Sequence, residues 1–283
     1  MFKGSRTMNA IVMNTDATNF ESIKIKQNAA WGSGDYSKVG VTLQITGEEL
    51  AETLDLPPGA RVLDVAAGNG NATMAFARRW ADVTSTDFVA SLLDGGKARA
   101  EAAGFDIDFQ LADAENLPFD DDVFDAVVST FGVMFTPDQK RSTSELARVC
   151  KSGGKIGLAN WTPDGLIGKL FETIGNYVPT PKDIKSPALW GSQKWIEDSF
   201  SNHSKSTAFN KKNFVFRYNS PAHFIDFFRA WYGPVQKAFE VLDVQEKRAL
   251  EQELLKLLNK FNTATDGTLR APSEYAEIVI TKY

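Results

Sequence analysis

The segment Val62-Leu-Asp-Val-Ala-Ala-Gly-Asn-Gly-Asn-Ala72 constrains the fold of this chain more than any other part of the sequence. An apolar run leads directly into a loop with glycines at positions 68 and 70, and a helical pattern follows from Asn71 to Trp80. Glycine tolerates positive φ angles and lets a ligand approach the backbone closely. The segment therefore predicts a buried strand, a ligand-facing turn and a helix in direct succession.

Short apolar runs alternate with helical patterns through the centre of the chain. Strands are expected at 61–66, 82–86, 106–111, 124–131 and 155–161, and helices at 71–80, 89–103, 137–150 and 166–177. Strands and helices that alternate at this spacing form a parallel sheet with right-handed crossovers. We therefore expect an α/β fold of the Rossmann-like, doubly wound class.

The two ends of the chain differ from this alternating centre. Residues 1–56 are expected to form an N-terminal helical segment or cap, frayed over 1–18. The C-terminal third has strand patterns at 206–218 and 277–282 with two helices between them, at 221–241 and 244–261. We interpret 219–263 as a helical lid, inserted over the ligand edge of a domain that spans 57–283.

Composition and charge exclude several classes of function. The chain has 31 Lys and Arg against 36 Asp and Glu, a formal net charge of −5, whereas nucleic-acid binders need clustered basic residues. No apolar stretch has the length of a membrane span or a signal peptide, and the single cysteine, Cys150, cannot form an internal disulfide. We expect a cytoplasmic protein that binds no nucleic acid and is not stably inserted in a membrane.

Polar side chains follow the ends of the next three predicted strands. Asp87 ends the second strand, where a carboxylate can accept both hydroxyls of a ribose. Asp113-Ala114-Glu115 follows the third, where an acceptor can read the exocyclic amine of adenine, and Ser129-Thr130-Phe131 closes the fourth at the switch point of the sheet. Each acidic residue alone is also typical of a solvated helix cap, but together they indicate a nucleoside site.

The glycine loop departs from the pattern of dinucleotide-binding proteins. The pattern Gly-x-Gly-x-x-Gly requires a third glycine where this chain has Thr73, and no Gly-Lys-Ser/Thr phosphate loop occurs. The site is therefore expected to hold a nucleoside without phosphates. An NAD-dependent oxidoreductase is a less favoured alternative.

These motifs together resemble class I S-adenosylmethionine-dependent methyltransferases, most closely the branch that is similar to ubiquinone and menaquinone biosynthesis enzymes. The resemblance covers about residues 58–162 and rests on the segments 62–70, 86–87, 112–119, 124–125 and 148–155. It implies a seven-stranded sheet, mostly parallel with an antiparallel edge, and S-adenosylmethionine as the cofactor.

The resemblance also implies roles for individual residues. The loop 68–70 would flank the methionine portion, Asp64 would support that loop, and Thr130 would lie beneath the sulfonium. Asp87 would hold the ribose, and Phe88 would pack on the adenine. The full cofactor-binding set, with Asp113 and Ala114 at the adenine edge, is Asp64, Ala66, Gly68, Gly70, Asp87, Phe88, Asp113, Ala114, Glu115 and Thr130.

Methyl transfer from a sulfonium depends mainly on alignment, and a general base is needed only when the nucleophile arrives protonated. His223 and Tyr36 are the candidates for that base. A helix-start position is the favoured interpretation of His223, whereas a packing role explains Tyr36 as well as a base does. Two histidines and one cysteine do not make the usual soft metal site, so no metal is expected.

The helix near Pro221 places five aromatic residues at helical spacing. They are Phe224, Phe227, Phe228, Trp231 and Tyr232. This face either packs on the sheet or lines an apolar pocket, and both can hold together.

The chain has Ser-Thr-Phe-Gly at 129–132, where base- and glutamine-amine methyltransferases carry Asn/Asp-Pro-Pro-Tyr/Phe. We expect a monomer or homodimer that methylates carbon or oxygen of a small, apolar or aromatic acceptor. A non-catalytic module that binds S-adenosylmethionine is the alternative from another class.

Overall fold

A seven-stranded sheet forms the centre of the computed structural model, which describes residues 20–181 and 184–283. The strands are β1 (Arg61–Val65), β2 (Asp82–Asp87), β3 (Asp108–Leu111), β4 (Phe124–Thr130), β5 (Cys150–Trp161), β6 (Ser204–Tyr218) and β7 (Leu269–Lys282). Their order is β3-β2-β1-β4-β5-β7-β6. The strands β1 to β5 run parallel, and β7 is antiparallel to both β5 and β6. The predicted Rossmann-like sheet with an antiparallel edge is confirmed.

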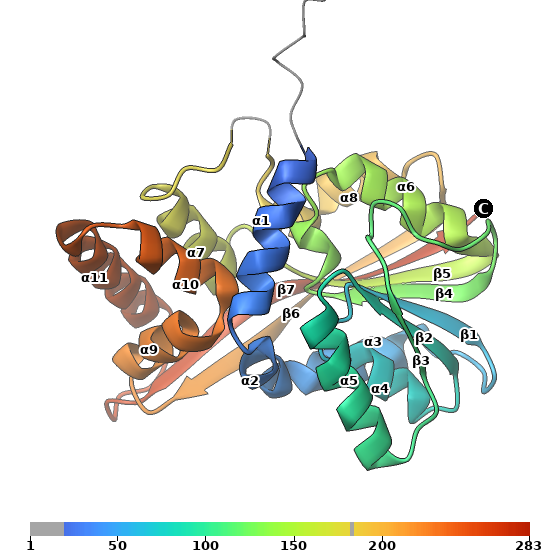
Figure 1. Cartoon of the computed structure of the whole chain (residues 1–283), viewed down its shortest axis with the longest axis horizontal. Helices are drawn as coiled ribbons and strands as arrows, with labels where there is room; N and C mark the ends of the chain where they lie inside the picture. Colours follow the sequence, from blue (N-terminus) through green and yellow to red (C-terminus); the bar gives the residue numbers. More distant parts are fainter. Residues whose placement is uncertain (1–19, 182–183) are drawn as a thin grey trace, which may run out of the picture.

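Helices cover both faces of this sheet (Figure 1). The α-helices are α1 (Phe20–Ser33), α2 (Tyr36–Gly40), α3 (Gln44–Leu54), α4 (Asn71–Ala77), α5 (Ala90–Ala103), α6 (Gln139–Val149), α7 (Leu166–Gly175), α8 (Gln193–Phe200), α9 (Pro221–Trp231), α10 (Gly233–Val241) and α11 (Val244–Phe261). Three short 3₁₀ helices are η1 (Val41–Leu43), η2 (Val133–Phe135) and η3 (Pro187–Gly191). In Figure 1, α3, α4 and α5 lie below the sheet and α6 and α8 above it.

The central strand β1 is apolar on both faces because helices cover both of them. Val62 packs with Leu54 of α3 and Phe76 of α4 in one core cluster. Leu63 points to the opposite face and packs in a second cluster with Leu146 of α6. Both strand residues are fully buried, so β1 fixes the position of the glycine loop at its carboxyl end.

The C-terminal edge differs from the prediction in two places. The last strand was expected at 277–282 but begins at Leu269, because the whole of β7 pairs with β6. The helix expected at 221–241 divides at Gly233-Pro234, where a Cβ on Gly233 would lie 2.5 Å from the carbonyl oxygen of Ala30. Pro234 explains the break, because it has no backbone N–H and is tolerated only in the first turn of a helix, here α10.

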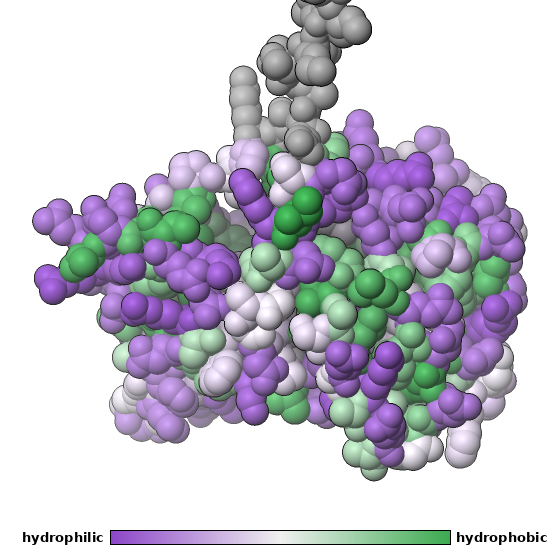
Figure 2. Space-filling model, in the orientation of Figure 1, coloured by the Kyte–Doolittle hydropathy of each residue, from purple (hydrophilic) through white to green (hydrophobic). Residues whose placement is uncertain are grey.

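The long β6–β7 pair carries α9, α10 and α11 away from the parallel half of the sheet (Figure 1). Figure 2 shows mostly hydrophilic side chains over α11 and over much of this face, whereas apolar residues gather beside α1. Within the described ranges, none of the helices combines the length and apolar character needed to traverse a bilayer. The domain boundary at 56/57 stays a prediction, and residues 1–19 of the N-terminal segment lie outside the described residues.

We expect Leu63→Ala to lower the free energy of unfolding by about 2–5 kcal/mol, because it leaves a cavity in the second core cluster. Leu111→Ala is the matched control, since Leu111 is 63% exposed and its loss should cost about 0.5 kcal/mol or less. Urea denaturation of both variants measures the difference. Equal losses would contradict the placement of β1 in the core.

Candidate functional site

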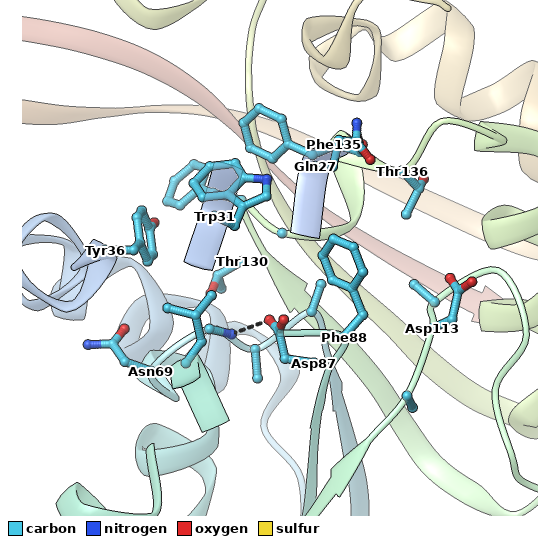
Figure 3. A pocket seen from close by; sticks show the side chains of 18 of the residues that line it. Gln27, Trp31, Tyr36, Asn69, Asp87, Phe88, Asp113, Thr130, Phe135 and Thr136 are labelled. Atoms are coloured by element: carbon cyan, nitrogen blue, oxygen red, sulfur yellow. Dashed lines mark hydrogen bonds between the residues drawn. The ribbon is translucent and has the colours of Figure 1, made fainter. Parts of the chain in front are cut away.

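The carboxyl ends of β1 to β4 surround one pocket. Figure 3 shows Asp87 within it, with Phe88 and Asp113 to one side and Tyr36 and Asn69 to the other. All the predicted cofactor residues except Asp64 and Gly70 line this pocket, and so does Tyr36. The structure therefore brings these predicted residues together, while their roles toward a cofactor stay predictions.

Hydrogen bonds connect the glycine loop and the start of α4 to β2, α5 and α2. Gly68 and Gly70 have φ angles of +59° and +80°, the left-handed region that glycine occupies without strain. The N–H of Gly68 donates to the Asp87 carboxylate at 2.9 Å. The Arg99 guanidinium donates to the carbonyl oxygen of Asn69, and the side chain of Asn71 donates to the carbonyl of Gly40.

Asp64 lies behind the loop and not in the pocket wall. Its Oδ2 accepts hydrogen bonds from the N–H and the hydroxyl of Thr73, at 2.8 and 2.6 Å. Its side chain is almost fully buried, and this burial raises the pKa of Asp64 to about 7 although Thr73 opposes the shift. Gly70 is likewise behind the pocket, where it precedes the first residue of α4.

Asp87 is the central acceptor of the pocket. Its second carboxylate oxygen accepts the N–H of Val89 at 2.9 Å, so both oxygens are held by backbone donors. Burial raises the pKa of Asp87 to about 6, against the opposing effect of those N–H groups. Each oxygen of an ionised carboxylate has capacity for a further hydrogen bond, so Asp87 can still accept from a ligand.

Two backbone strains at the rim were not signalled by the sequence. Ala66 and Phe131 have positive φ angles of 52° and 56°, which cost free energy in residues with a side chain. Gly132, the residue after Phe131, lies directly against Ala66: a Cβ at position 132 would lie 2.1 Å from the carbonyl oxygen of Ala66. The turns after β1 and β4 are therefore in close contact, and both turns line the pocket.

Helix α1 covers the pocket and is held there by polar contacts. Lys24 donates to Asp113 at 2.8 Å and lies 3.4 Å from Glu115. Gln27 donates to the carbonyl oxygen of Phe135, and Asn28 donates to that of Phe88. Lys24, Gln27 and Trp31 also line the pocket.

The sequence predicted a helical segment or cap over 1–56 but not the contacts of α1 with the pocket. This helix has no apolar stripe, and none of its residues, all of which are described, is buried. Segment 219–263, which was expected as the lid and is described throughout, contributes no residue to the wall of this pocket. Its helices lie beside α1 instead, where α10 contacts it.

The aromatic helix α9 turns one face inward. Phe224, Phe228 and Tyr232 are buried, and the first two rings stack at 4.0 Å between centroids. Trp231 is 37% exposed, so the five aromatics do not share one face as predicted. Phe228 and Tyr232 line a second, smaller cavity. The buried face of α9 therefore both packs in the core and lines a cavity.

The two candidate bases have different positions. His223 lies at the exposed start of α9, where its Nδ1 accepts the N–H of Asn219 at 3.3 Å, and it lines neither cavity. Tyr36 lines both cavities, and burial together with the charge of Asp87 raises its pKa far above neutral pH. The Tyr36 hydroxyl is therefore protonated at neutral pH, and its role as a base stays a prediction. Over the described residues, no group of three or more His, Cys, Asp or Glu is placed to hold a metal ion.

Comparisons of the sequence agree with this geometry. A family model described as "Methyltransferase domain" matches residues 62–154. An uncharacterized protein of Mycobacterium tuberculosis is 40% identical over 245 residues, which cover 85% of this chain and 89% of that protein. A demethylmenaquinone methyltransferase of Clavibacter sepedonicus is 38% identical over 136 residues, which cover 46% of this chain and 55% of that enzyme.

Solved structures share the fold at low sequence identity. The YcgJ protein of Bacillus subtilis matches with a TM-score of 0.57 and 19% identity, covering 84% of this chain and 99% of that one. A phosphoethanolamine N-methyltransferase of Haemonchus contortus, solved in complex with S-adenosyl-L-methionine, matches with a TM-score of 0.52 and 15% identity, covering 84% of this chain and 52% of that one.

The raised pKa of Asp64 predicts a pH dependence of stability. A carboxyl whose pKa rises on folding binds its proton more tightly in the folded state, so it stabilises the fold at low pH. The ordinary pKa of an aspartate is about 4, and that of folded Asp64 is about 7. Between these two pH values the free energy of unfolding falls by up to about 1.4 kcal/mol for each pH unit. Asp64→Asn keeps an acceptor for Thr73 but removes the ionisation.

Urea denaturation at a series of pH values between those limits measures the effect. The wild type should lose more free energy of unfolding than Asp64→Asn as the pH rises. Parallel curves for the two proteins would show that Asp64 ionises normally.

Proposed function

The chain belongs to the class I methyltransferases, and we propose that it transfers the methyl group of S-adenosylmethionine to carbon or oxygen of a small, apolar or aromatic acceptor. One observation carries the proposal: the glycine loop, Asp87 and Asp113 converge on a single pocket at the ends of successive parallel strands. Open α/β sheets bind their ligands at this edge.

The wall of the pocket suits each part of the cofactor. The loop 66–68 presents backbone and little side chain, which fits the methionine portion. Asp87 has acceptor capacity for the ribose hydroxyls, and Phe88 offers a ring to the adenine. Asp113 supplies an acceptor at the far side, where the exocyclic amine of adenine would lie.

The start of α4 supports a cofactor without phosphates. A dinucleotide places its pyrophosphate against the free N–H groups of such a helix. Here the N–H of Thr73 donates to Asp64, and the carboxyl group of Asp64 lies behind the loop. One donor is therefore already used, which argues against the NAD alternative.

The chemistry requires little from the protein beyond placement. The sulfonium is an activated methyl donor, and alignment of donor and nucleophile alone is worth about 7–11 kcal/mol. Helix α1 covers the pocket through Lys24, Gln27 and Trp31, which restricts access of water to the reacting atoms. Since Tyr36 stays protonated at neutral pH, we propose that no tyrosine acts as a base. The acceptor's oxygen or carbon would form the bond to the methyl group as the S–CH3 bond breaks, S-adenosylhomocysteine would be the leaving group, and the acceptor's proton would pass to solvent.

Turnover separates this enzyme from a non-catalytic module with the same pocket. The protein is incubated with S-adenosylmethionine and a panel of phenols, quinols and fatty acids, and the release of S-adenosylhomocysteine is measured. We expect release that depends on one class of acceptor. Tight cofactor binding without release for any acceptor class would favour the binding module.

Asp87→Asn should weaken S-adenosylhomocysteine binding by about 10- to 100-fold, because a hydrogen bond to a charged acceptor contributes about 1.5–3 kcal/mol. Asp82→Asn is the matched control, since Asp82 is exposed at the other end of the same strand. Isothermal titration calorimetry measures both affinities. Unchanged affinity for Asp87→Asn would remove this carboxylate from the cofactor site.

A further inference from the structure

Lys24 of α1 lies among three carboxylates at the end of the pocket that is assigned to adenine. Its ammonium donates to Asp113 Oδ2 at 2.8 Å, lies 3.4 Å from Glu115 and pairs with Glu21 of its own helix at 2.7 Å. The Lys24 side chain is only 16% exposed and lines the pocket, whereas that of Glu21 is 79% exposed. An exposed ion pair within one helix contributes little, so the pairs with Asp113 and Glu115 are the ones that can affect the pocket.

The Asp113 carboxylate is held at both of its oxygens. Oδ1 accepts the N–H of Glu115 at 2.9 Å within the turn that follows β3, and Oδ2 accepts from Lys24, which lies 89 positions away in the chain. The terminal torsion of an aspartate side chain is broad, so one hydrogen bond alone leaves the carboxylate able to rotate. The bond from Lys24 therefore fixes the direction in which Asp113 presents its remaining acceptor capacity.

Charge repulsion gives Lys24 a second effect on Asp113. Glu115 is only 6% exposed, and its Oε1 is held by the N–H of Asp138 at 2.7 Å. The Asp113 side chain is 32% exposed, so it is the one of these two carboxylates that can move toward solvent. Like charges that are close together are unfavourable. Loss of the Lys24 charge therefore favours movement of Asp113 away from Glu115.

The donors of the Lys24 ammonium are taken up by these carboxylates. An ammonium has three N–H donors, and Glu21, Asp113 and Glu115 surround this one. Burial disfavours its charge, but hydrogen bonds to Asp113 and Glu21 outweigh burial and raise the pKa of Lys24 above its ordinary value. Lys24 therefore stays charged at neutral pH and acts on the pocket through Asp113.

We propose that Lys24 is a positioning residue, which holds the Asp113 carboxylate in place to accept the 6-amino group of adenine and so makes the pocket selective for a 6-aminopurine. This inference rests on the proposed function, because it requires an adenosine in the pocket. A 6-oxopurine presents a carbonyl oxygen to the same carboxylate, and two acceptors form no hydrogen bond.

The first experiment compares two ligands that differ at position 6 of the base. Wild type and Lys24→Met are titrated in a calorimeter with S-adenosylhomocysteine and with S-inosylhomocysteine, in which a carbonyl oxygen replaces the 6-amino group. The wild type should prefer S-adenosylhomocysteine by about 10- to 100-fold, the effect of one hydrogen bond to a charged acceptor. Lys24→Met should weaken S-adenosylhomocysteine binding about five- to tenfold and leave S-inosylhomocysteine binding unchanged.

The ratio of the two affinities separates positioning from a merely structural role. If Lys24 only attached α1 to the rest of the domain, Lys24→Met would weaken both ligands by the same factor, and that result overturns the proposal. Unchanged S-inosylhomocysteine affinity also shows that the variant is folded.

Lys26→Met is the matched control, because it removes the same charge from the same helix at an exposed position outside the pocket wall. Its two affinities should equal those of the wild type. A fall in the preference as large as that of Lys24→Met would be an effect of net charge alone and would overturn the assignment of Lys24.

The second experiment repeats Lys24→Met in an Asp113→Asn background. Asp113→Asn alone should lower the preference, and the added Lys24→Met should change it no further, because Lys24 acts through the Asp113 carboxylate. A further five- to tenfold fall, about the effect of one more hydrogen bond, would show direct contact with the ligand and would overturn the positioning role.

The wild-type titrations separate the two levels of inference. Absence of S-adenosylhomocysteine binding contradicts the proposed function itself. Binding of S-adenosylhomocysteine and S-inosylhomocysteine with equal affinity contradicts the selectivity proposed here and leaves the cofactor site in place.

Discussion

The hydrogen bond from the Gly68 N–H to the Asp87 carboxylate connects the two strand ends on which the pocket depends. It requires a residue with a left-handed backbone at position 68 and a carboxylate at the end of β2. The conformation of the loop after β1 therefore depends on the side chain that ends β2. Burial opposes the ionisation of Asp87, whereas its backbone donors favour it. Two ribose hydroxyls would add donors to the same oxygens and so stabilise the charged form further.

The rest of the rim is assembled from segments distant in the chain. The strained turns at Ala66 and Phe131 meet at Gly132, and α1 reaches across to Asp113 through Lys24. These contacts bring the N-terminal helix and the strand ends together over the same pocket. The apolar side is built differently, from rings on β5, β6 and α9 that pack on one another.

Local patterns predicted the parallel half of the molecule well. The glycine loop, Asp87 and Asp113 follow strands whose apolar runs are unambiguous, and the structure places them at one edge. The strand order at the C-terminal edge came from the family resemblance, since residues such as Ser273 and Glu274 interrupt the apolar run of β7. The role of α1 could not be predicted, because it depends on single polar contacts to residues 60 to 108 positions away.

The insertion between β6 and β7 contributes to only one of the two cavities. Phe228 lies in α9 and Tyr232 directly follows it, whereas the described residues of this insertion add nothing to the pocket around Asp87. The insertion still bears on that pocket indirectly, because Tyr232 packs on Trp31 and Tyr36, two residues of its wall. The fold therefore builds the pocket around Asp87 from the parallel strand ends and α1, and draws on the insertion only for the second cavity.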